Sequence, residues 1–407
     1  MTRAQLSWAL YDWGNSAFAT TVLAGFFPIF FNQYWAAGVP PQTQTLYQGL
    51  TATTASLVVM LLSPWLGAIA DRHGAKKRFL AVLTLMGVVS TAALYLVGKG
   101  QWGWAIALSI AARIGFFGGI SLYDALLVSV AHPREMDRVS ALGYGLGYLG
   151  GGLLFAINVA MALKPQWFGL ADAALATRVA FVSVAIWWLV FALPLFRYVP
   201  ETPPRGGASG WRELFATLRA LRGLRPVWMF LIAYWLYIDG VDTIIVMAVD
   251  FGMKLGFASD HLIGALLLVQ FIGFPAALVF GRLGERWGTR RAIFVALAVY
   301  TAVTIGAYHL QTLTQFYLMA AAIGCVQGGV QSLSRSYYAR LIPSERAGEF
   351  FGFYNMIGKF AAVLGPTVVG ITAQLSGSAR DAILSLLVFF IAGAVLLARV
   401  RDPLRGV

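Results

Sequence analysis

The most regular feature of the sequence is a series of long apolar runs separated by short polar stretches. Most runs reach about 20 residues, the length of helix that crosses a hydrocarbon layer about 30 Å thick. Because backbone amides inside a membrane must pair within their own segment, and a barrel strand needs only about 10 residues, the runs predict α-helices. The twelve runs are 6–31, 46–70, 80–98, 103–131, 139–162, 177–197, 227–250, 261–283, 292–310, 314–341, 350–374 and 381–398.

Composition supports a membrane location and excludes a soluble enzyme. The chain is 59% hydrophobic and 12% charged, whereas soluble domains are about 25% charged. The fold class that follows is an all-α membrane protein with twelve transmembrane helices. Enzymatic chemistry has no support, because the sequence has no phosphate-binding GxxxxGK[ST] loop, and its four His residues and single Cys325 do not have metal-ligand spacing. We expect no bound metal or cofactor.

The net charge of +13 is concentrated on one side of the predicted helices. Twenty-two of the thirty Lys and Arg residues fall in the two tails and the loops of one side, and only five fall in the other loops. By the positive-inside rule both termini face the cytoplasm. The basic charge therefore implies no nucleic-acid partner. We expect a monomer in a bacterial inner membrane, contacting lipids and a small-molecule substrate, with its first helix retained.

The two halves of the chain repeat each other. Between the second and third runs lie Gly67, Asp71, Arg72, Gly74, Lys76 and Lys77, and 214 residues later lie Gly281, Glu285, Arg286, Gly288, Arg290 and Arg291. Parallel six-helix repeats predict a central site between two bundles. The predicted domains are bundles 1–198 and 226–398, a linker 199–225 and a tail 399–407. In the linker, apolar residues at helical spacing predict a short amphipathic helix over 211–222, with a solvated basic segment as the alternative.

Several segments resemble a known family. The segment 67–78, GAIADRHGAKKR, resembles the signature loop of the major facilitator superfamily. The segments YDWGNSAFATTVLAGFFPIFF (11–31), YIDGVDTII (237–245) and GKFAAVLGP (358–366) resemble its vacuolar-effluxer branch, which includes autophagy-related amino-acid effluxers. The resemblance implies alternating access by rocking of two six-helix bundles. It also implies that Asp71 and Arg72 belong to a cytoplasmic latch that includes Gly67 and Gly74, with Gly281, Glu285, Arg286 and Gly288 repeating it.

Seven charged residues lie well inside the apolar runs, away from their ends: Asp12, Arg113, Asp124, Asp239, Asp242, Arg335 and Lys359. A charge facing lipid at mid-membrane costs about 2.5–3.5 kcal/mol, so these residues are expected to face one another or water. Arg113 and Asp124 share a helix face but lie about 16 Å apart along the axis, so each needs another partner. With Asn15 one turn further in, Asp12 is expected near Asp124, and repulsion between the two carboxylates favours protonation of one.

Asp12 and Asp124 are therefore the candidates for proton coupling; the alternative is that they pair with Arg113, helix caps or tyrosines. In the second half, Asp239 and Asp242 share one helix face, as do Asn355 and Lys359. A bridge from Lys359 to Asp239 or Asp242 would form a gate or a substrate site, or else a structural contact. Gln327, Gln331 and Arg335 offer polar contacts for a solute or for neighbouring helices. We interpret Lys76, Lys77 and Arg78 as ordinary positive-inside residues.

These patterns favour a secondary transporter of a small polar organic solute, with amino acids first by resemblance and a proton gradient as the driving force. A lipid or amphiphile flippase on the same scaffold is the alternative, given 28 Phe and 13 Trp residues. A third possibility is a membrane receptor that transports nothing, in which the charges would form closed salt bridges.

Overall fold

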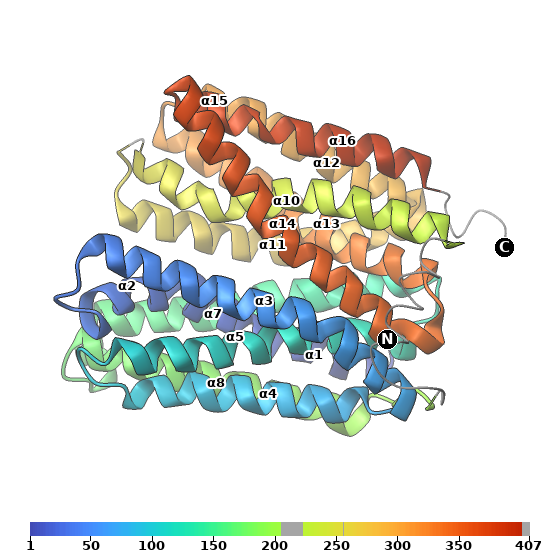
Figure 1. Cartoon of the computed structure of the whole chain (residues 1–407), viewed down its shortest axis with the longest axis horizontal. Helices are drawn as coiled ribbons and strands as arrows, with labels where there is room; N and C mark the ends of the chain where they lie inside the picture. The colour runs from blue at the N-terminus through green and yellow to red at the C-terminus, as the bar shows by residue number, and fades with distance from the viewer. Residues whose placement is uncertain (205–222, 255, 401–407) are drawn as a thin grey trace.

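The computed structural model describes residues 1–204, 223–254 and 256–400, and these residues form a bundle of long helices (Figure 1). Twelve helical segments in the described residues are long and apolar enough to cross a membrane. The predicted all-α class with twelve transmembrane helices is therefore confirmed, and no strand occurs in the described residues. The predicted amphipathic helix over 211–222 lies outside the described residues.

The helices extend past the ends of most apolar runs. In the first half they are α1 (Arg3–Ala17), η1 (Phe18–Phe26), α2 (Phe27–Phe30), η2 (Phe31–Trp35), α3 (Pro41–His73), α4 (Lys76–Ala93), η3 (Leu94–Leu96), α5 (Trp102–Ala125), α6 (Leu127–Val130), α7 (Met136–Leu163), η4 (Pro165–Phe168) and α8 (Ala173–Tyr198). In the second half they are α10 (Arg225–Lys254), α11 (Ser259–Trp287), α12 (Thr289–Tyr308), α13 (Leu313–Leu341), η5 (Ser344–Arg346), α14 (Ala347–Ser376), α15 (Ala379–Leu384) and α16 (Leu386–Arg399).

The first membrane span is not the uniform α-helix that its apolar run predicts. It widens into π-helix over η1 and again over η2. At the start of η1 the Thr20 hydroxyl donates to the carbonyls of Ser16 and of Gly151 in α7, at 3.1 and 3.2 Å. Side-chain bonds of this kind compete with the backbone for helix carbonyls, which favours a local change of pitch. Such π-helical segments often occur beside functional sites.

The helices form two groups that meet along a few helix pairs. Figure 1 shows α1 to α8, in blue and green, on one side and α10 to α16, in yellow to red, on the other. Across the boundary α14 packs against α3 and α5, while α7 packs against α11 and α13. Any space between the two groups is therefore bounded by these helices.

One end of the bundle carries the N-terminus and the short connections α3–α4 and α11–α12. We call it the inner end, after the orientation that the basic residues predict. Both connections turn at glycines with positive φ: Gly74 (58°) ends α3 and Gly288 (92°) separates α11 from α12. Residues with a Cβ rarely adopt these backbone angles. The matched glycines of the repeated motif thus perform the same task in both halves.

Candidate functional site

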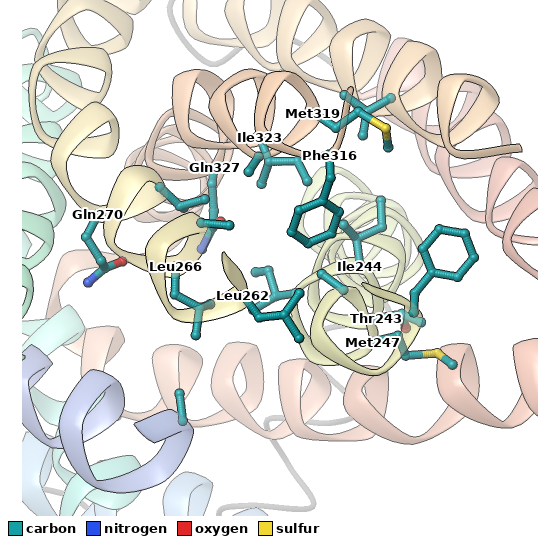
Figure 2. A pocket seen from close by; sticks show the side chains of 18 of the residues that line it. Thr243, Ile244, Met247, Leu262, Leu266, Gln270, Phe316, Met319, Ile323 and Gln327 are labelled. Carbon is teal, nitrogen blue, oxygen red and sulfur yellow. The ribbon is translucent and has the colours of Figure 1, made fainter. Parts of the chain in front are cut away.

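The central space between the two halves is a cavity of ≈ 360 Å³, bounded mainly by α1, η1, α7, α10, α11 and α13. Most of its lining is aliphatic or aromatic, and Figure 2 shows Leu262, Leu266, Phe316, Met319 and Ile323 around it. Polar lining residues are fewer: Ser16, Thr20, Tyr144, Tyr148, Thr243, Gln270, Thr304, Gln327 and Gln331. Among the described residues, no Asp, Glu, Lys, Arg or His lines the cavity. The wall can therefore contact an apolar group and form hydrogen bonds with a few neutral polar atoms.

Tyr144, Tyr148 and Gln331 line the cavity on the side of Arg335, and we call these three residues the cavity floor. The Tyr148 hydroxyl donates to Gln331 Oε1 at 3.2 Å, which joins α7 of the first half to α13 of the second. The guanidinium carbon of Arg335 lies 4.3 Å from the centre of the Tyr144 ring, a cation–π distance. The floor thus separates the neutral cavity from charged groups behind it.

Behind the floor lies a buried set of polar residues that we call the Arg335 cluster: Asp12, Tyr123, Asp124, Ser140, Arg335 and Asn355. Arg335 donates from Nη1 to Asp124 Oδ1 at 2.9 Å, and Nη1 lies 3.6 Å from Asp12 Oδ2. Its other donors reach the Ser140 hydroxyl and carbonyl, both at 2.9 Å. Because Arg335 comes from α13 and its partners come from α1, α5 and α7, the cluster joins the two halves.

Charge balance within the Arg335 cluster leaves one carboxylate in excess. Asp124 accepts from Arg335 and also from Asn355 Nδ2, at 3.2 Å. Asp12 accepts from the Tyr123 hydroxyl at 3.0 Å and lies farther from the guanidinium. The Asp12 side chain is 14% exposed, against 4% for Asp124. Asp12 is therefore the more weakly paired and more accessible of the two acids.

A second group of charges, the Lys359 group, consists of Arg113, Phe117, Asp242 and Lys359. Lys359 Nζ of α14 lies 3.1 Å from the centre of the Phe117 ring of α5. Asp242 of α10 attracts Lys359 electrostatically, and Arg113 of α5 repels it. Arg113 donates from Nε to Ser109 Oγ at 3.3 Å, one turn away on its own helix. The three ionised residues are partly exposed rather than sealed.

Asn15 and Asp239 occupy separate buried positions. Asn15 contacts Tyr11 and does not line the cavity, although the next residue, Ser16, does. Asp239 accepts from the backbone amide of Gly365 in α14 at 2.8 Å, directly before Pro366. In the described chain Lys359 is therefore associated with Asp242, and Asp239 with the backbone of α14. Asn355, expected to act beside Lys359, instead bonds to Asp124 because it lies one turn nearer the inner end.

At the inner end, Asp71 of α3 caps the start of α14. Its two carboxylate oxygens accept from the amides of Gly348 and Glu349, at 3.0 and 2.8 Å. A carboxylate at a helix N-terminus is favoured both by the free amides and by the helix dipole. The contact is tight, because a Cβ on Gly67 would lie 2.1 Å from the Gly348 carbonyl oxygen. This contact closes the inner end between α3 and α14.

Lys76 is part of the same contact, which differs from the interpretation of this residue as an ordinary basic loop residue. Its ammonium lies 2.7 Å from Asp71 Oδ1, and its side chain is 0% exposed. It also donates to the Thr202 hydroxyl in the linker. Arg72, expected in the latch, has no polar partner in the described part of the chain and is partly exposed. The position that pairs with the acid is therefore five residues after Asp71, where helix α4 begins.

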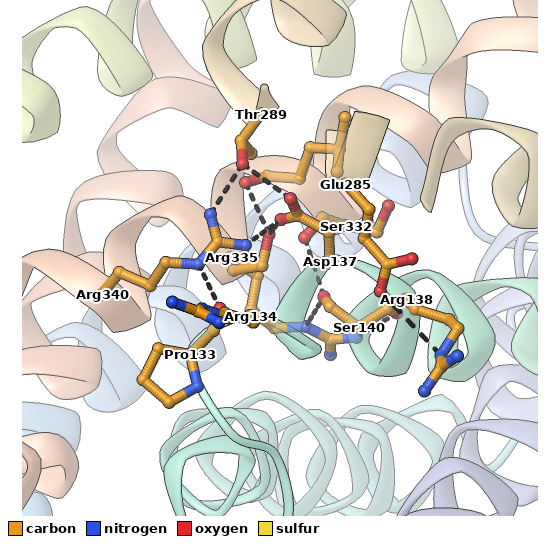
Figure 3. A network of polar contacts seen from close by, with 12 residues as sticks. Pro133, Arg134, Asp137, Arg138, Ser140, Glu285, Thr289, Ser332, Arg335 and Arg340 are labelled. Carbon is orange, nitrogen blue, oxygen red and sulfur yellow. Dashed lines mark hydrogen bonds and ion pairs between the residues drawn. The ribbon is translucent and has the colours of Figure 1, made fainter. Parts of the chain in front are cut away.

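A second contact closes the inner end where α7 of the first half meets α12 and α13 of the second half (Figure 3). Asp137 accepts from Thr289 at 2.7 Å and also from Ser336 and Arg340. Arg340 also donates to the Thr289 hydroxyl at 2.6 Å and to the Pro133 carbonyl at 2.9 Å. Of these contacts, only the one between Arg340 and Thr289 lies within the second half. The others cross between the two groups of helices. Together with Asp71 they leave the cavity closed towards the inner end.

The repeated motif of the second half takes a peripheral part in this closure. Gly281 lies against α7, where a Cβ would approach the Ala141 Cβ to 2.6 Å. Glu285 lies 3.9 Å from Arg138, and that arginine is half exposed. Arg286 is exposed and has no polar partner in the described ranges. The strong contacts are made instead by Asp137 and Arg340, which the sequence patterns did not single out.

Of the predicted substrate or coupling residues, Gln327 and Gln331 line the cavity. Asp12, Asp124, Arg335 and Asn355 are gathered in the Arg335 cluster, while Arg113, Asp242 and Lys359 form the Lys359 group. Charge does not mark Tyr144 and Tyr148 in the sequence, because an uncharged residue in an apolar helix carries little cost of burial. Their i, i+4 spacing, which places both rings on one face of α7, is the signal that was available.

Comparisons with known proteins agree on the family. A family model described as "Vacuole effluxer Atg22 like" matches residues 42–403. The "Uncharacterized MFS-type transporter YxiO" of Bacillus subtilis (strain 168) is 37% identical over 408 residues, covering 98% of this chain and 95% of that protein. "Autophagy-related protein 22" of Yarrowia lipolytica is 26% identical, covering 69% of this chain and 53% of that protein. This chain thus spans about half the length of the Atg22 relative.

The fold is shared with a solved transporter. The crystal structure of the human organic anion transporter MFSD10 (TETRAN) superposes with a TM-score of 0.76 at 17% identity, covering 97% of this chain and 99% of that one. Together with the twelve membrane-spanning helices, these matches confirm the resemblance seen in the sequence and exclude an enzyme. The chain belongs to the Atg22-like vacuole effluxer family within the major facilitator superfamily, and it is a multi-pass membrane protein of the secondary-transporter class.

Proposed function

We propose that this protein is a proton-coupled secondary transporter of small organic solutes that have an apolar body and a polar head group. Amino acids with apolar side chains are the first candidates. The observation that carries the proposal is the ≈ 360 Å³ cavity between the two halves, closed towards the inner end and lined by apolar side chains with a few amides and hydroxyls. A cavity of this size fits a small ligand.

The lining favours some solute classes over others. An apolar side chain gains about 25 cal/mol for each Å² that it buries, so the aliphatic wall rewards an apolar body. A sugar or a multiply charged metabolite would lose many hydrogen bonds to water, and the described wall has too few polar groups to replace them. Gln270, Gln327 and Gln331 can serve one polar head group.

The Arg335 cluster supplies the proposed coupling site. One guanidinium faces two carboxylates, so binding of one proton balances the cluster. Asp12 is the proposed proton acceptor, because its carboxylate is the more weakly paired and more exposed. Since the cluster joins helices of both halves, separation of the halves at the inner end removes Arg335 from Asp12. Proton binding and opening of the inner end are then linked by charge balance.

The transport test uses purified protein in proteoliposomes loaded with unlabelled leucine, phenylalanine, lysine or glutamate. We expect counterflow of labelled leucine and phenylalanine, with little counterflow of lysine or glutamate. Counterflow of only the charged amino acids would contradict the proposed specificity.

Coupling is tested with Asp12→Asn in the same vesicles under an imposed pH gradient. The variant should retain counterflow but lose pH-driven accumulation, because its side chain cannot exchange a proton. Asp172→Asn, which changes an exposed acid at the start of α8, is the matched control. Unchanged accumulation in Asp12→Asn would rule out this residue as the coupling site.

A lipid or amphiphile transporter is the second candidate, and the apolar character of the cavity wall favours it. The two proposals differ in the solute that is transported. Transport of a short-chain amphiphile by protein that shows no leucine counterflow would favour the second candidate. We further propose the orientation with both termini in the cytoplasm, in which the closed inner end faces the cell interior.

A further inference from the structure

We propose that Arg113 and Lys359 form a binding site for the carboxylate of the transported solute, and that Asp242 is the internal counter-ion that this carboxylate displaces. The inference deepens the proposed function and rests on it, because it assigns the chemistry of the polar head group that accompanies an apolar body. It concerns residues that do not line the cavity itself.

The two cations come together across the boundary between the halves. Arg113 and Phe117 lie four residues apart on α5, so they project from the same face of that helix. Lys359 of α14 places its ammonium 3.1 Å from the centre of the Phe117 ring. Arg113 acts on Lys359 as a like charge. The guanidinium and the ammonium are therefore neighbours on the path between α5 and α14.

The charges in this region do not balance. Arg113 and Lys359 carry two positive charges, and the acid that acts on Lys359 is Asp242 alone. Asp239 accepts from the Gly365 amide and Thr243, and it is not among the charges that act on Lys359. Among the described residues, no carboxylate lies within salt-bridge distance of Arg113. An uncompensated cation inside a membrane protein is costly unless it meets water or a ligand. One added anion neutralises the group.

The Lys359 group is also adjacent to the cavity. Asp242 acts electrostatically on the hydroxyls of Tyr144 and Tyr148, and both tyrosines belong to the cavity floor. The residue after Asp242, Thr243, lines the cavity. Arg113, Asp242 and Lys359 are all partly exposed. A solute with its apolar body in the cavity can therefore extend its head group towards these cations.

A carboxylate suits this pair better than other head groups do. The planar guanidinium of Arg113 can donate two parallel hydrogen bonds to one carboxylate. Lys359 has a compact charge on a flexible stem, so it can leave Asp242 and turn to a second anion. An ammonium group would meet two like charges and only one acid. The head group that this site selects is thus anionic, and a bound carboxylate would hold α5 to α14 across the two halves.

The experiment uses three probes that share an apolar body and differ only in the head group: 4-methylpentanoate, 4-methylpentanamide and 4-methylpentan-1-amine. Binding to the purified full-length protein in detergent is measured from the rise in melting temperature with probe concentration. We expect 4-methylpentanoate to stabilise the wild type at concentrations at least about tenfold lower than the other two, as charge-assisted hydrogen bonds imply.

Three variants separate a binding role from a structural one. Arg113→Gln and Lys359→Gln should each weaken 4-methylpentanoate binding by about tenfold or more and leave 4-methylpentanamide binding unchanged. Asp242→Asn should strengthen 4-methylpentanoate binding, because it removes the competing internal anion. Lys99→Gln, which removes an exposed lysine in the loop before α5, is the control and should behave as wild type. A general loss of packing would not produce opposite effects in Asp242→Asn and Lys359→Gln.

The outcomes distinguish the inference from the proposed function. If leucine counterflow occurs but the three probes bind equally, or Arg113→Gln and Lys359→Gln bind 4-methylpentanoate as the wild type does, the carboxylate site is wrong and the transporter assignment stands. If no probe with this apolar body binds and leucine does not exchange, both proposals fail. If either glutamine variant does not fold, the Asp242→Asn result decides: unchanged or weaker 4-methylpentanoate binding overturns the inference.

Discussion

A single guanidinium, that of Arg335, holds together a buried set of polar residues from both halves. Arg335 contacts two carboxylates, a hydroxyl and a carbonyl from three helices of the first half. Its side chain is also flanked by the rings of Trp8, Tyr123 and Tyr144. Because so many partners fix the position of this cation, its removal should affect stability as well as function.

We expect Arg335→Gln to lower the free energy of unfolding by about 3–5 kcal/mol, because Asp12 and Asp124 are left as buried acids without their cation. The loss should be smaller at pH 5 than at pH 8, since the two acids can bind protons when the guanidinium is gone. Melting temperatures in detergent at both pH values measure this. Arg286→Gln, which changes an exposed arginine at the inner end of α11, is the comparison variant. An equal loss in Arg335→Gln at both pH values would contradict the account.

At the residue scale, the sequence predicts that the intramembrane charges share a protected environment, but it does not predict their pairs. Burial cost applies to each charged residue singly and can be estimated from the sequence. Which charges pair depends on which helices of the two halves pack together. The paired residues Asp124 and Arg335 lie about 200 positions apart in the sequence. Lys76 departs from its predicted role for a related reason: the positive-inside rule describes loops statistically and does not indicate which lysine is buried.

At the scale of elements, the contact between α3 and α14 closes one side of the inner end. Gly67 meets Gly348 without room for a methyl group, and Asp71 caps the helix that starts there. The two glycines allow the backbones to approach closely, as small residues do at many helix contacts in membranes. The element pattern itself was predictable, because apolar length and matched glycines indicate twelve helices and two equivalent turns.

Gly67→Ala should destabilise the closed inner end by roughly 1–3 kcal/mol, because the new Cβ would overlap the Gly348 carbonyl. The measurement is the rate at which an impermeant maleimide modifies Ser140→Cys in a Cys325→Ser background. We expect about a tenfold faster modification in the Gly67→Ala variant. Gly306→Ala is the control, since a Cβ there meets no atom within 4 Å. Equal rates in both variants would show that this contact does not control closure.

The start of the linker is attached to the α3–α4 turn through Glu201. We expect the strength of this attachment to depend on pH. Glu201 accepts from the Lys77 amide at 3.0 Å, and burial raises the pKa of the Glu201 carboxyl. Since the acid binds its proton more readily when docked, the attachment is strongest at low pH. It weakens as pH rises through the interval between the ordinary pKa and the raised one.

Glu201→Gln removes this dependence, because its amide side chain carries no charge at any pH. We expect parent and variant to have similar melting temperatures at pH 4 and the variant to melt slightly higher at pH 7. Thr202→Ser, which retains the hydroxyl beside Lys76, should follow the parent at both values. A variant that is less stable than the parent at pH 7 would contradict this direction.

At the scale of the whole molecule, transport requires the two helix groups to separate at the inner end. The Ser140 hydroxyl donates to the Ser332 carbonyl at 2.7 Å, so α7 and α13 touch there in the closed form. Major facilitator membership and the internal repeat predict such rocking in general terms. The closed state and the neutral character of the cavity wall could not be predicted, because both depend on how side chains pack between the halves.

A cross-link between α7 and α13 should therefore stop transport. Ser140→Cys with Ser332→Cys, in a Cys325→Ser background, is expected to lose leucine counterflow on mild oxidation and to regain it on reduction. The single Ser140→Cys protein should be unaffected by the same treatment. Full activity of the oxidised double variant, with the cross-link verified by mass spectrometry, would show that the halves need not part at this point.

The burial of Arg335, Asp12 and Asp124 between the two halves has a consequence for the speed of the cycle. Each opening of the inner end must bring solvent to these ions, and each closing must expel it again. Withdrawing water with a large inert osmolyte should hence slow turnover and favour the shut form, in proportion to osmotic pressure rather than to viscosity. The number of waters taken up per cycle would then be obtained from the slope of the logarithm of the rate against osmolality.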